Sequence, residues 1–317
     1  MIPINQVIQG DCKEVLTTFP SDRAQLICTS PPYGNQRKGS YGGIPPDEYV
    51  EWFRPIAAQL HRVLAPRGSF ILNIKESTVY GVRHSYVMDL VDALQWEGWF
   101  WIEEYVWVKS SCYPGKWPTR FRDGWERVFH FSKCRRPTMY QDAVRVAASE
   151  ATKKRVQKLS PNDHVRSPSR SGSGLRRRLA NWVGRETVYP SNVLTLAPTC
   201  FDTKHSAAFP VELPTWFIKL FSRPGDLVID PFLGSGTTAV AALQQDRCYL
   251  GIEVIAKYCA LARHRLALAA GRPAKTGTEP VADNADHVQE ADRESLLELL
   301  EPMDSQSADP AQARRDS

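Results

Sequence analysis

The residues best suited to chemistry lie in two short motifs, one near the start of the chain and one near its end. The first runs from Ser30 through Pro31 and Pro32 to Tyr33. A serine hydroxyl and a backbone carbonyl held rigid by prolines can both accept hydrogen bonds from an amino group. The tyrosine adds a flat face on which a planar ring can stack. The alternative interpretation is an ordinary Pro-Pro turn without chemistry.

The second motif begins at Asp230, includes Phe232 and turns through Gly234 and Gly236 into a helix that we expect to start near Thr237. Glycines let the backbone approach a ligand closely, and the first N–H groups of a helix favour a carboxylate. No Lys follows the second glycine, which excludes a phosphate-binding P-loop. A structural strand-to-helix turn is the alternative.

A carboxylate beyond this motif favours ligand binding. Glu253 ends the next predicted strand, about 20 residues after Asp230, which is the spacing at which a carboxylate accepts ribose hydroxyls in dinucleotide sites. The sequence therefore predicts a site for a ligand that carries both a ribose and a carboxylate.

Apolar runs and turn residues predict the elements that must position these motifs. Pro55 should kink or divide the first long helix, which Asp47 could cap, and residues 66–68 should form a turn. Alternation of strands and helices indicates an α/β sheet covered on both faces. The expected strands are 25–28, 69–74, 100–108, 127–131, 227–229 and 249–252, and the expected helices are 49–64, 86–94, 213–221, 238–243 and 256–268.

Taken together, the two motifs resemble the signature motifs of the amino-methylating DNA methyltransferases. The serine motif comes first, which is the order of the β group, a circular permutation of the usual nucleotide-binding layout. The resemblance implies a Rossmann-like α/β sheet that binds S-adenosylmethionine, with an inserted target-recognition region. It makes Ser30, Pro31, Pro32 and Tyr33 the catalytic loop and the glycine motif the cofactor loop.

The resemblance adds two further segments to the cofactor site. The segment containing Lys204, His205 and Phe209 is similar to the one that lines the methionine end of S-adenosylmethionine in this family. Asp11, after a predicted strand at the N-terminus, is similar to the family's contribution beside the adenine ring. Each segment taken alone would be read as a plain loop.

The resemblance also bears on the substrate base. In this family a first-position Ser is associated mainly with methylation of cytosine N4, and Asp mainly with adenine N6. The base has to leave the duplex to reach such a loop. C5-cytosine methylation requires a Cys nucleophile, usually after a Pro, and no Cys here follows a Pro. Adenine N6 methylation and a DNA-binding protein without catalysis stay as alternatives.

Composition places the protein among globular proteins of a reducing compartment. The 317 residues include 7 Cys without a Cys-x-x-Cys pair, which favours the cytoplasm and argues against a zinc site. No apolar run is long enough to span a membrane, and the N-terminus does not resemble a secretion signal. We expect a soluble cytoplasmic enzyme that needs no metal.

Charge is distributed unevenly along the chain. The segment after residue 270 is acidic, so the preceding part is more basic than the net charge of +5 indicates. Ten Lys and Arg lie between residues 153 and 185, where we expect contact with double-stranded DNA; a solvated basic loop is the alternative. The candidate DNA contacts are Arg37, Lys38, Trp117, Lys153, Lys154, Arg155, Arg170, Arg176, Arg177 and Arg178.

These patterns predict four regions. Residues 1–134 form the catalytic half of a methyltransferase domain, 135–199 a basic and partly flexible target-recognition insertion, and 200–270 the cofactor-binding half. Residues 271–317 form an acidic tail that we expect to be disordered, apart from a short leucine stripe at 296–300. A monomer or homodimer, with a cognate restriction endonuclease as a possible partner, fits this organisation.

Overall fold

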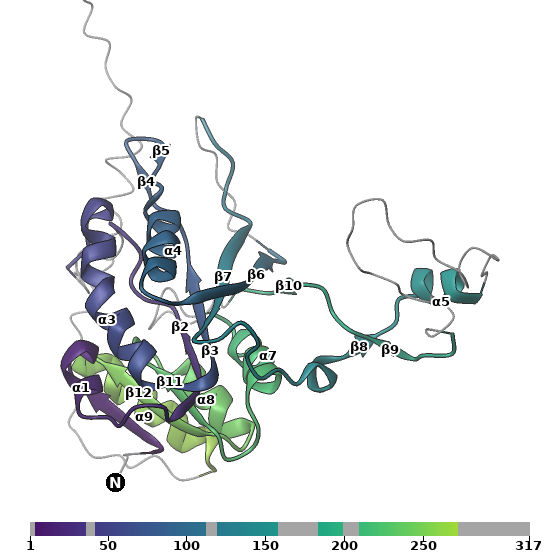
Figure 1. Ribbon diagram of the computed structural model, residues 1–317. Helices are drawn as coiled ribbons and strands as arrows, with labels where there is room; N and C mark the ends of the chain where they lie inside the picture. The colour runs from purple at the N-terminus through teal and green to yellow at the C-terminus, as the bar shows by residue number, and fades with distance from the viewer. Residues whose placement is uncertain (1–3, 36–41, 112–118, 158–182, 199–208, 272–317) are drawn as a thin grey trace, which may run out of the picture. The chain divides into compact units, whose positions relative to one another are not determined.

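An eight-stranded sheet in the order β1-β12-β11-β2-β3-β7-β6-β10 forms the centre of the protein (Figure 1). The computed structural model describes residues 4–35, 42–111, 119–157, 183–198 and 209–271. All neighbouring strands are parallel except that β7 runs antiparallel to both β3 and β6. The strands are β1 (Gln6–Gln9), β2 (Ala24–Thr29), β3 (Leu64–Ile74), β6 (Phe100–Lys109), β7 (Trp125–Ser132), β10 (Val193–Leu196), β11 (Leu227–Asp230) and β12 (Cys248–Glu253).

Helices cover both faces of the sheet, as the sequence predicts. Side chains of each strand alternate between two apolar clusters: Ile27 packs into one, while Leu26 and Cys28 pack into the other. The first cluster, here called the α3 face, contains α1 (Cys12–Thr17), α3 (Tyr49–Val63) and α4 (Tyr86–Trp96). The second, the α7 face, contains α7 (Glu212–Phe221), α8 (Thr237–Gln244) and α9 (Ala256–Ala269).

Strands β2 and β11 are parallel neighbours, paired at Leu26–Val228 and Ile27–Ile229. Between them the connections to the following helices change from one face of the sheet to the other. The chain leaves β2 toward α3 on one face and leaves β11 toward α8 on the other. Ligands of open α/β sheets bind at the carboxyl ends of strands at such a switch point. The two motifs follow these two strands.

The described parts of the segment 135–199 are bonded to helix α7 near one end and to the sheet near the other. The amide of Tyr140 donates to the carbonyl of Leu220 at 2.7 Å, and β10 extends the sheet beside β6. Between these ties lie η2 (Gln141–Val144), β8 (Val146–Ala147), α5 (Glu150–Gln157) and β9 (Thr187–Val188). Two shorter elements, η1 (Pro46–Glu48) and the hairpin β4 (Thr78–Val79) and β5 (Val82–Arg83), belong to the first half of the chain.

Three local predictions are wrong. The helix α3 is not divided, because Pro55 faces solvent while Phe53 and Ile56 anchor the other side in the core. Asp47 does not cap this helix; its carboxylate lies 2.9 Å from Nε2 of His84. Residues 66–68 lie within β3, where a shift of register lets exposed residues bulge from the strand.

Residues Met1–Ala274 belong to one compact unit. The predicted acidic tail 271–317, with its leucine stripe at 296–300, lies outside the described residues from residue 272 on. No helix in the described part of the chain is long and apolar enough to cross a membrane.

Candidate active site

The two motifs meet at adjacent strand ends. Oγ1 of Thr29, the last residue of β2, donates a 2.6 Å hydrogen bond to Oδ1 of Asp230, the last residue of β11. Both side chains are buried. Two loops far apart in the sequence are therefore held together by a direct bond, next to Ser30 on one side and the glycine turn on the other.

Both oxygens of the Asp230 carboxylate accept hydrogen bonds from within the protein. Oδ1 also accepts from the amide of Phe232 at 3.0 Å, and Oδ2 accepts from Oγ1 of Thr238 at 2.6 Å. Burial raises the pKa of Asp230 to about 6, although these hydrogen bonds oppose the shift. Asp230 thus shapes the loop between β11 and α8, and its own contact with a cofactor stays a prediction.

The glycine turn is compact and requires its glycines. Gly234 and Gly236 have φ of 53° and 91°, the left-handed region that other residues avoid. A Cβ on Gly236 would also lie 2.9 Å from Cβ of Ala262 on α9. Arg265, on the same helix, donates to the carbonyl and hydroxyl of Ser235, both at 2.8 Å. Helix α9 therefore fixes the turn from behind, and α8 begins at Thr237 as predicted.

Glu253 lies beside this turn. Its carboxylate accepts from the amides of Gly234 at 2.8 Å and Ile255 at 2.9 Å, and its backbone carbonyl accepts from Gly10 at 3.0 Å. A carboxylate only accepts hydrogen bonds, which suits it to the hydroxyls of a ribose. The segment after β1 is thereby joined to the cofactor loop, where Asp11 caps α1 by accepting from the amide of Lys13 at 2.8 Å.

Aromatic side chains flank the same loop. The ring of Phe232 lies 5.7 Å from Trp52 and 6.4 Å from Phe53, both on α3. Phe209 is half-buried against the α7 face, whereas Lys204 and His205 lie outside the described residues. The loop thus combines an apolar wall, a helix N-terminus and a buried carboxylate, which suits a nucleoside carrying an amino acid. S-adenosylmethionine has this chemistry, and the residues present fit it.

The serine motif is held from its other side by two tyrosines of the α3 face. The hydroxyl of Tyr49 donates to the carbonyl of Pro32 at 2.8 Å, and the amide of Gly34 donates to the hydroxyl of Tyr86 at 3.2 Å. A Cβ on Gly34 would come within 3.3 Å of Tyr86, so the chain passes close to this ring. The backbone of the loop is fixed by these bonds as well as by its prolines.

Polar side chains from three strands converge on the serine motif. Oγ of Ser30 donates to the hydroxyl of Tyr33 at 3.1 Å, and that hydroxyl donates to Oε2 of Glu126 at 2.9 Å. Oδ1 of Asn73 lies 3.3 Å from the same hydroxyl, and Nζ of Lys109 lies 2.7 Å from Oε1 of Glu126. Sequence reasoning missed Asn73, Lys109 and Glu126. A charged residue inside the apolar run of β7 is the signal that could have identified Glu126.

The hydroxyl of Tyr33 stays protonated in this setting. Burial first, and then the negative charge of Glu126, raise the pKa of Tyr33 well above its ordinary value. The side chain is half-buried against the α3 face, with its hydroxyl fixed by the polar groups described above.

Few of the predicted DNA contacts can be placed. Lys153 pairs with Glu150 at 3.0 Å on α5, and Lys154 is exposed on the same helix, which also contains the backbone of Arg155. Arg37, Lys38, Trp117, Arg170, Arg176, Arg177 and Arg178 lie outside the described residues.

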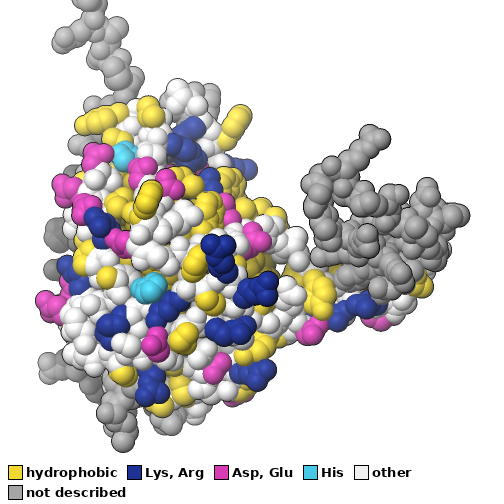
Figure 2. Space-filling view, viewed as in Figure 1, with side chains coloured by type: hydrophobic (Ala, Val, Ile, Leu, Met, Phe, Trp, Pro, Cys, Tyr) yellow, Lys and Arg dark blue, Asp and Glu magenta, His cyan; other side chains and the backbone are white. Residues whose placement is uncertain are grey.

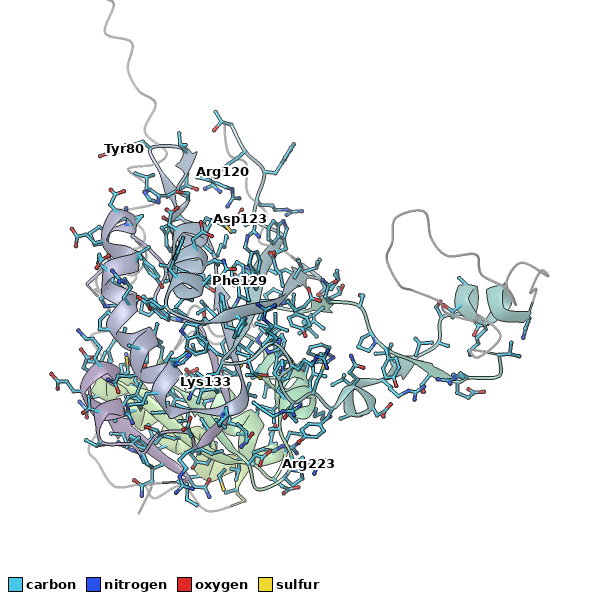
Figure 3. All side chains as sticks on the ribbon, viewed as in Figure 1. Tyr80, Arg120, Asp123, Phe129, Lys133 and Arg223 are labelled. Atoms are coloured by element: carbon cyan, nitrogen blue, oxygen red, sulfur yellow. The ribbon has the colours of Figure 1, made fainter. Side chains whose placement is uncertain are left out.

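An exposed rim of aromatic and basic residues near the serine motif was not predicted. Tyr80, at the tip of the β4–β5 hairpin, is fully exposed (Figure 3). Phe121, which precedes β7, is almost as exposed. Arg83 forms an ion pair with Asp123, which also binds Lys75 at 2.7 Å. Figure 2 shows hydrophobic side chains projecting at the top of this view, with Lys and Arg side chains spread below them. In the described ranges, no cluster of three or more His, Cys, Asp or Glu is arranged to hold a metal ion.

Comparison with known proteins matches this arrangement to one family. The family model N6_N4_Mtase, described as DNA methylase, matches residues 24–264. The chain is 29% identical to the type II methyltransferase M.PvuII of Proteus hauseri over 278 residues, covering 81% of this chain and 82% of that protein.

Two solved structures share the fold. The PvuII DNA methyltransferase, titled cytosine-N4-specific, superposes with a TM-score of 0.62 at 24% identity, covering 90% of this chain and 91% of that one. A Thermus thermophilus protein in complex with S-adenosyl-L-methionine gives a TM-score of 0.53 at 22% identity, covering 83% and 95%. The fold is therefore the predicted Rossmann-like methyltransferase sheet. With its family match extending over most of the sheet and both motifs, the chain belongs to the N6/N4 DNA methylase family.

Proposed function

We propose that the protein is a site-specific DNA methyltransferase that transfers the methyl group of S-adenosylmethionine to N4 of cytosine in double-stranded DNA. The observation that carries this proposal is the Thr29–Asp230 bond, which holds the serine motif against the cofactor loop. A base amino group on one side and a methyl donor on the other would then meet within one site, and alignment of two reactants is a large source of catalysis.

The cofactor is S-adenosylmethionine, which supplies a methyl group on a positively charged sulfur, a good leaving group. Glu253 accepts the ribose hydroxyls, Phe232 contacts the adenine, and the start of α8 at Thr237 faces the carboxylate. Asp230 and Arg265 keep this loop in shape. Contacts from Asp11, Lys204, His205 and Phe209 remain part of the proposal.

The substrate amino group binds at the serine motif. Ser30 accepts a hydrogen bond from the NH₂ group, as does a backbone carbonyl of the Pro31–Pro32 pair. Because Tyr49 occupies the carbonyl of Pro32, the carbonyl of Pro31 is the better acceptor. Drawing both N–H bonds toward acceptors localises the nitrogen lone pair and directs it at the methyl carbon. The face of Tyr33 stacks on the extruded base.

Cytosine N4 is favoured by the first-position Ser30 and by the similarity to a cytosine-N4-specific enzyme. Adenine N6 is the second candidate, because the family includes both specificities and both bases present an NH₂ group. Double-stranded DNA would approach the carboxyl ends of the strands, with residues 135–199 reading the target. A cognate restriction endonuclease is a further proposal, suggested by the type II relative, and so is action as a monomer or homodimer.

One experiment tests both the reaction and the base. The protein is incubated with plasmid DNA and S-adenosylmethionine carrying an isotopically labelled methyl group, and the DNA is then digested to nucleosides for mass spectrometry. We expect labelled N4-methylcytosine, and sequencing of the undigested DNA should place it in a single sequence context. Labelled N6-methyladenine would assign the alternative base, and absence of label from DNA would reject methyltransferase activity.

A further inference from the structure

The hydrogen bonds around Tyr33 have a direction that follows from which groups possess protons. Tyr33 and Ser30 have one hydroxyl proton each, whereas the carboxylate of Glu126 has none and can only accept. The Tyr33 hydroxyl must therefore donate its hydrogen bond toward β7, where Oε2 of Glu126 lies 2.9 Å away. Its oxygen can then only accept from Ser30.

The neighbouring groups reinforce this direction. The amide of Asn73 donates to the carbonyl of Arg127 at 3.0 Å and to Glu126 at 3.3 Å, which turns its oxygen toward Tyr33. Lys109, at 2.7 Å from Oε1 of Glu126, forms an ion pair that holds that side chain in place. Every partner of the Tyr33 hydroxyl from β3 and β7 is thus an acceptor.

We propose that Glu126 is a positioning residue that orients the proton of Ser30 through Tyr33, so that the Ser30 oxygen presents only lone pairs to the amino group of the substrate. This inference rests on the proposed function and extends it to a residue that never touches the base. A serine whose proton pointed outward would oppose the incoming N–H bond. Because the Tyr33 hydroxyl donates to Glu126, it has to accept from Ser30, and in this way it relays the influence of Glu126 to the Ser30 proton. The ring of Tyr33 provides the stacking face in addition.

The direct test is Glu126→Gln, which has nearly the same shape. The amide oxygen of the new side chain faces Lys109, which needs an acceptor, so its NH₂ group faces Tyr33 and opposes the original direction. We expect kcat to fall by about ten-fold to a hundred-fold, the effect of a lost hydrogen bond to a charged group, while the dissociation constant for S-adenosylmethionine is unchanged. An unchanged kcat would overturn the proposal.

A matched control variant distinguishes the positioning role of Glu126 from the effect of losing any ion pair between β6 and β7. Glu104 pairs with Arg127 across the same two strands and contacts neither Ser30 nor Tyr33. Glu104→Gln should leave kcat at the wild-type value. If Glu126→Gln leaves Lys109 too poorly paired to fold, the apolar pair Glu126→Leu with Lys109→Met, which removes the acceptor on β7 together with its cation, should show the same loss of kcat in a protein that still binds cofactor.

The decisive readout is the dependence on the Tyr33 hydroxyl. In a Tyr33→Phe background the relay is already absent, so adding Glu126→Gln should lower kcat no further. An equal additional loss in that background would mean that Glu126 acts by another route and would overturn the inference. Failure of the proposed function is distinguishable, because the wild-type protein would then label no DNA in the same assay.

Discussion

At the scale of single residues, the structure shows how far each motif residue is bonded to other protein groups. Asp230, predicted as a cofactor ligand from its motif, accepts hydrogen bonds from Thr29, Phe232 and Thr238. Ser30, in contrast, lies half-exposed and donates to the hydroxyl of Tyr33. The sequence could predict which loops contain the candidate site residues, whereas the bonds that fix each side chain depend on the fold.

Substitution of the serine motif should separate catalysis from cofactor binding. We expect Ser30→Ala or Tyr33→Ala to lower methyl transfer by at least about a hundred-fold, because each removes a group that aligns the amino nitrogen. Calorimetry should give the wild-type affinity for S-adenosylmethionine, since neither residue belongs to the loop after β11. Unchanged turnover in both variants would refute the assigned roles.

The buried carboxyl of Asp230 should make stability depend on pH. Its pKa is about 6 in the folded chain against an ordinary value of 3.8, so the folded state binds the extra proton between these values. Stability should therefore fall as pH rises from 4 to 6, by up to roughly 3 kcal/mol for this group. Denaturant titrations across this range should show a shallower fall for Asp230→Asn; an identical pH profile would contradict this account.

At the scale of elements, the sequence predicted the strands and helices with strong apolar patterns and missed the short ones. The pairs β4–β5 and β8–β9 have two residues per strand, too few for an alternation to be visible. Strand β10 was included in the insertion because nothing in its four residues shows that it joins the main sheet. Glu126 and Lys109 were missed because the bond of Glu126 to Tyr33, and its ion pair with Lys109, depend on how distant strands align.

The hairpin β4–β5 should contribute to DNA binding. Tyr80 is an exposed ring at the tip of a turn that Arg83 and Asp123 anchor, on the edge of the sheet where the serine motif lies. We expect Tyr80→Ala to weaken DNA binding by about ten-fold, the value of one aromatic stacking contact, without changing cofactor affinity.

The matched control for the hairpin is Trp96, an equally exposed aromatic residue at the opposite end of α4 from Tyr86. DNA affinity of both variants is measured by fluorescence-anisotropy titration with labelled DNA, and Trp96→Ala should leave it unchanged. Equal weakening by both substitutions would show a non-specific effect of lost aromatic surface and would remove the hairpin from the DNA interface.

At the scale of the whole molecule, the uneven distribution of charge along the chain should affect the affinity for DNA and its dependence on salt. The segment after residue 270 is acidic while the rest is basic, so the tail lowers the net positive charge that attracts the protein to DNA. Truncation after Gly271 should tighten non-specific DNA binding at low salt, and the difference should vanish as salt screens the charges. A truncated protein with the same affinity at every salt concentration would show that the charge of the tail does not affect DNA binding.

The bond between Thr29 and Asp230 joins residues 201 positions apart, and this separation has a consequence for biosynthesis. On the ribosome, β2 and its loop emerge long before β11 exists, so the growing polypeptide exposes an unpaired strand edge until β11 has been made. Contacts of such long range slow folding and leave intermediates open to aggregation. Enzyme activity can therefore arise only after β11 and the loop that follows it have been synthesised, and a product interrupted before them would have no means of modifying DNA.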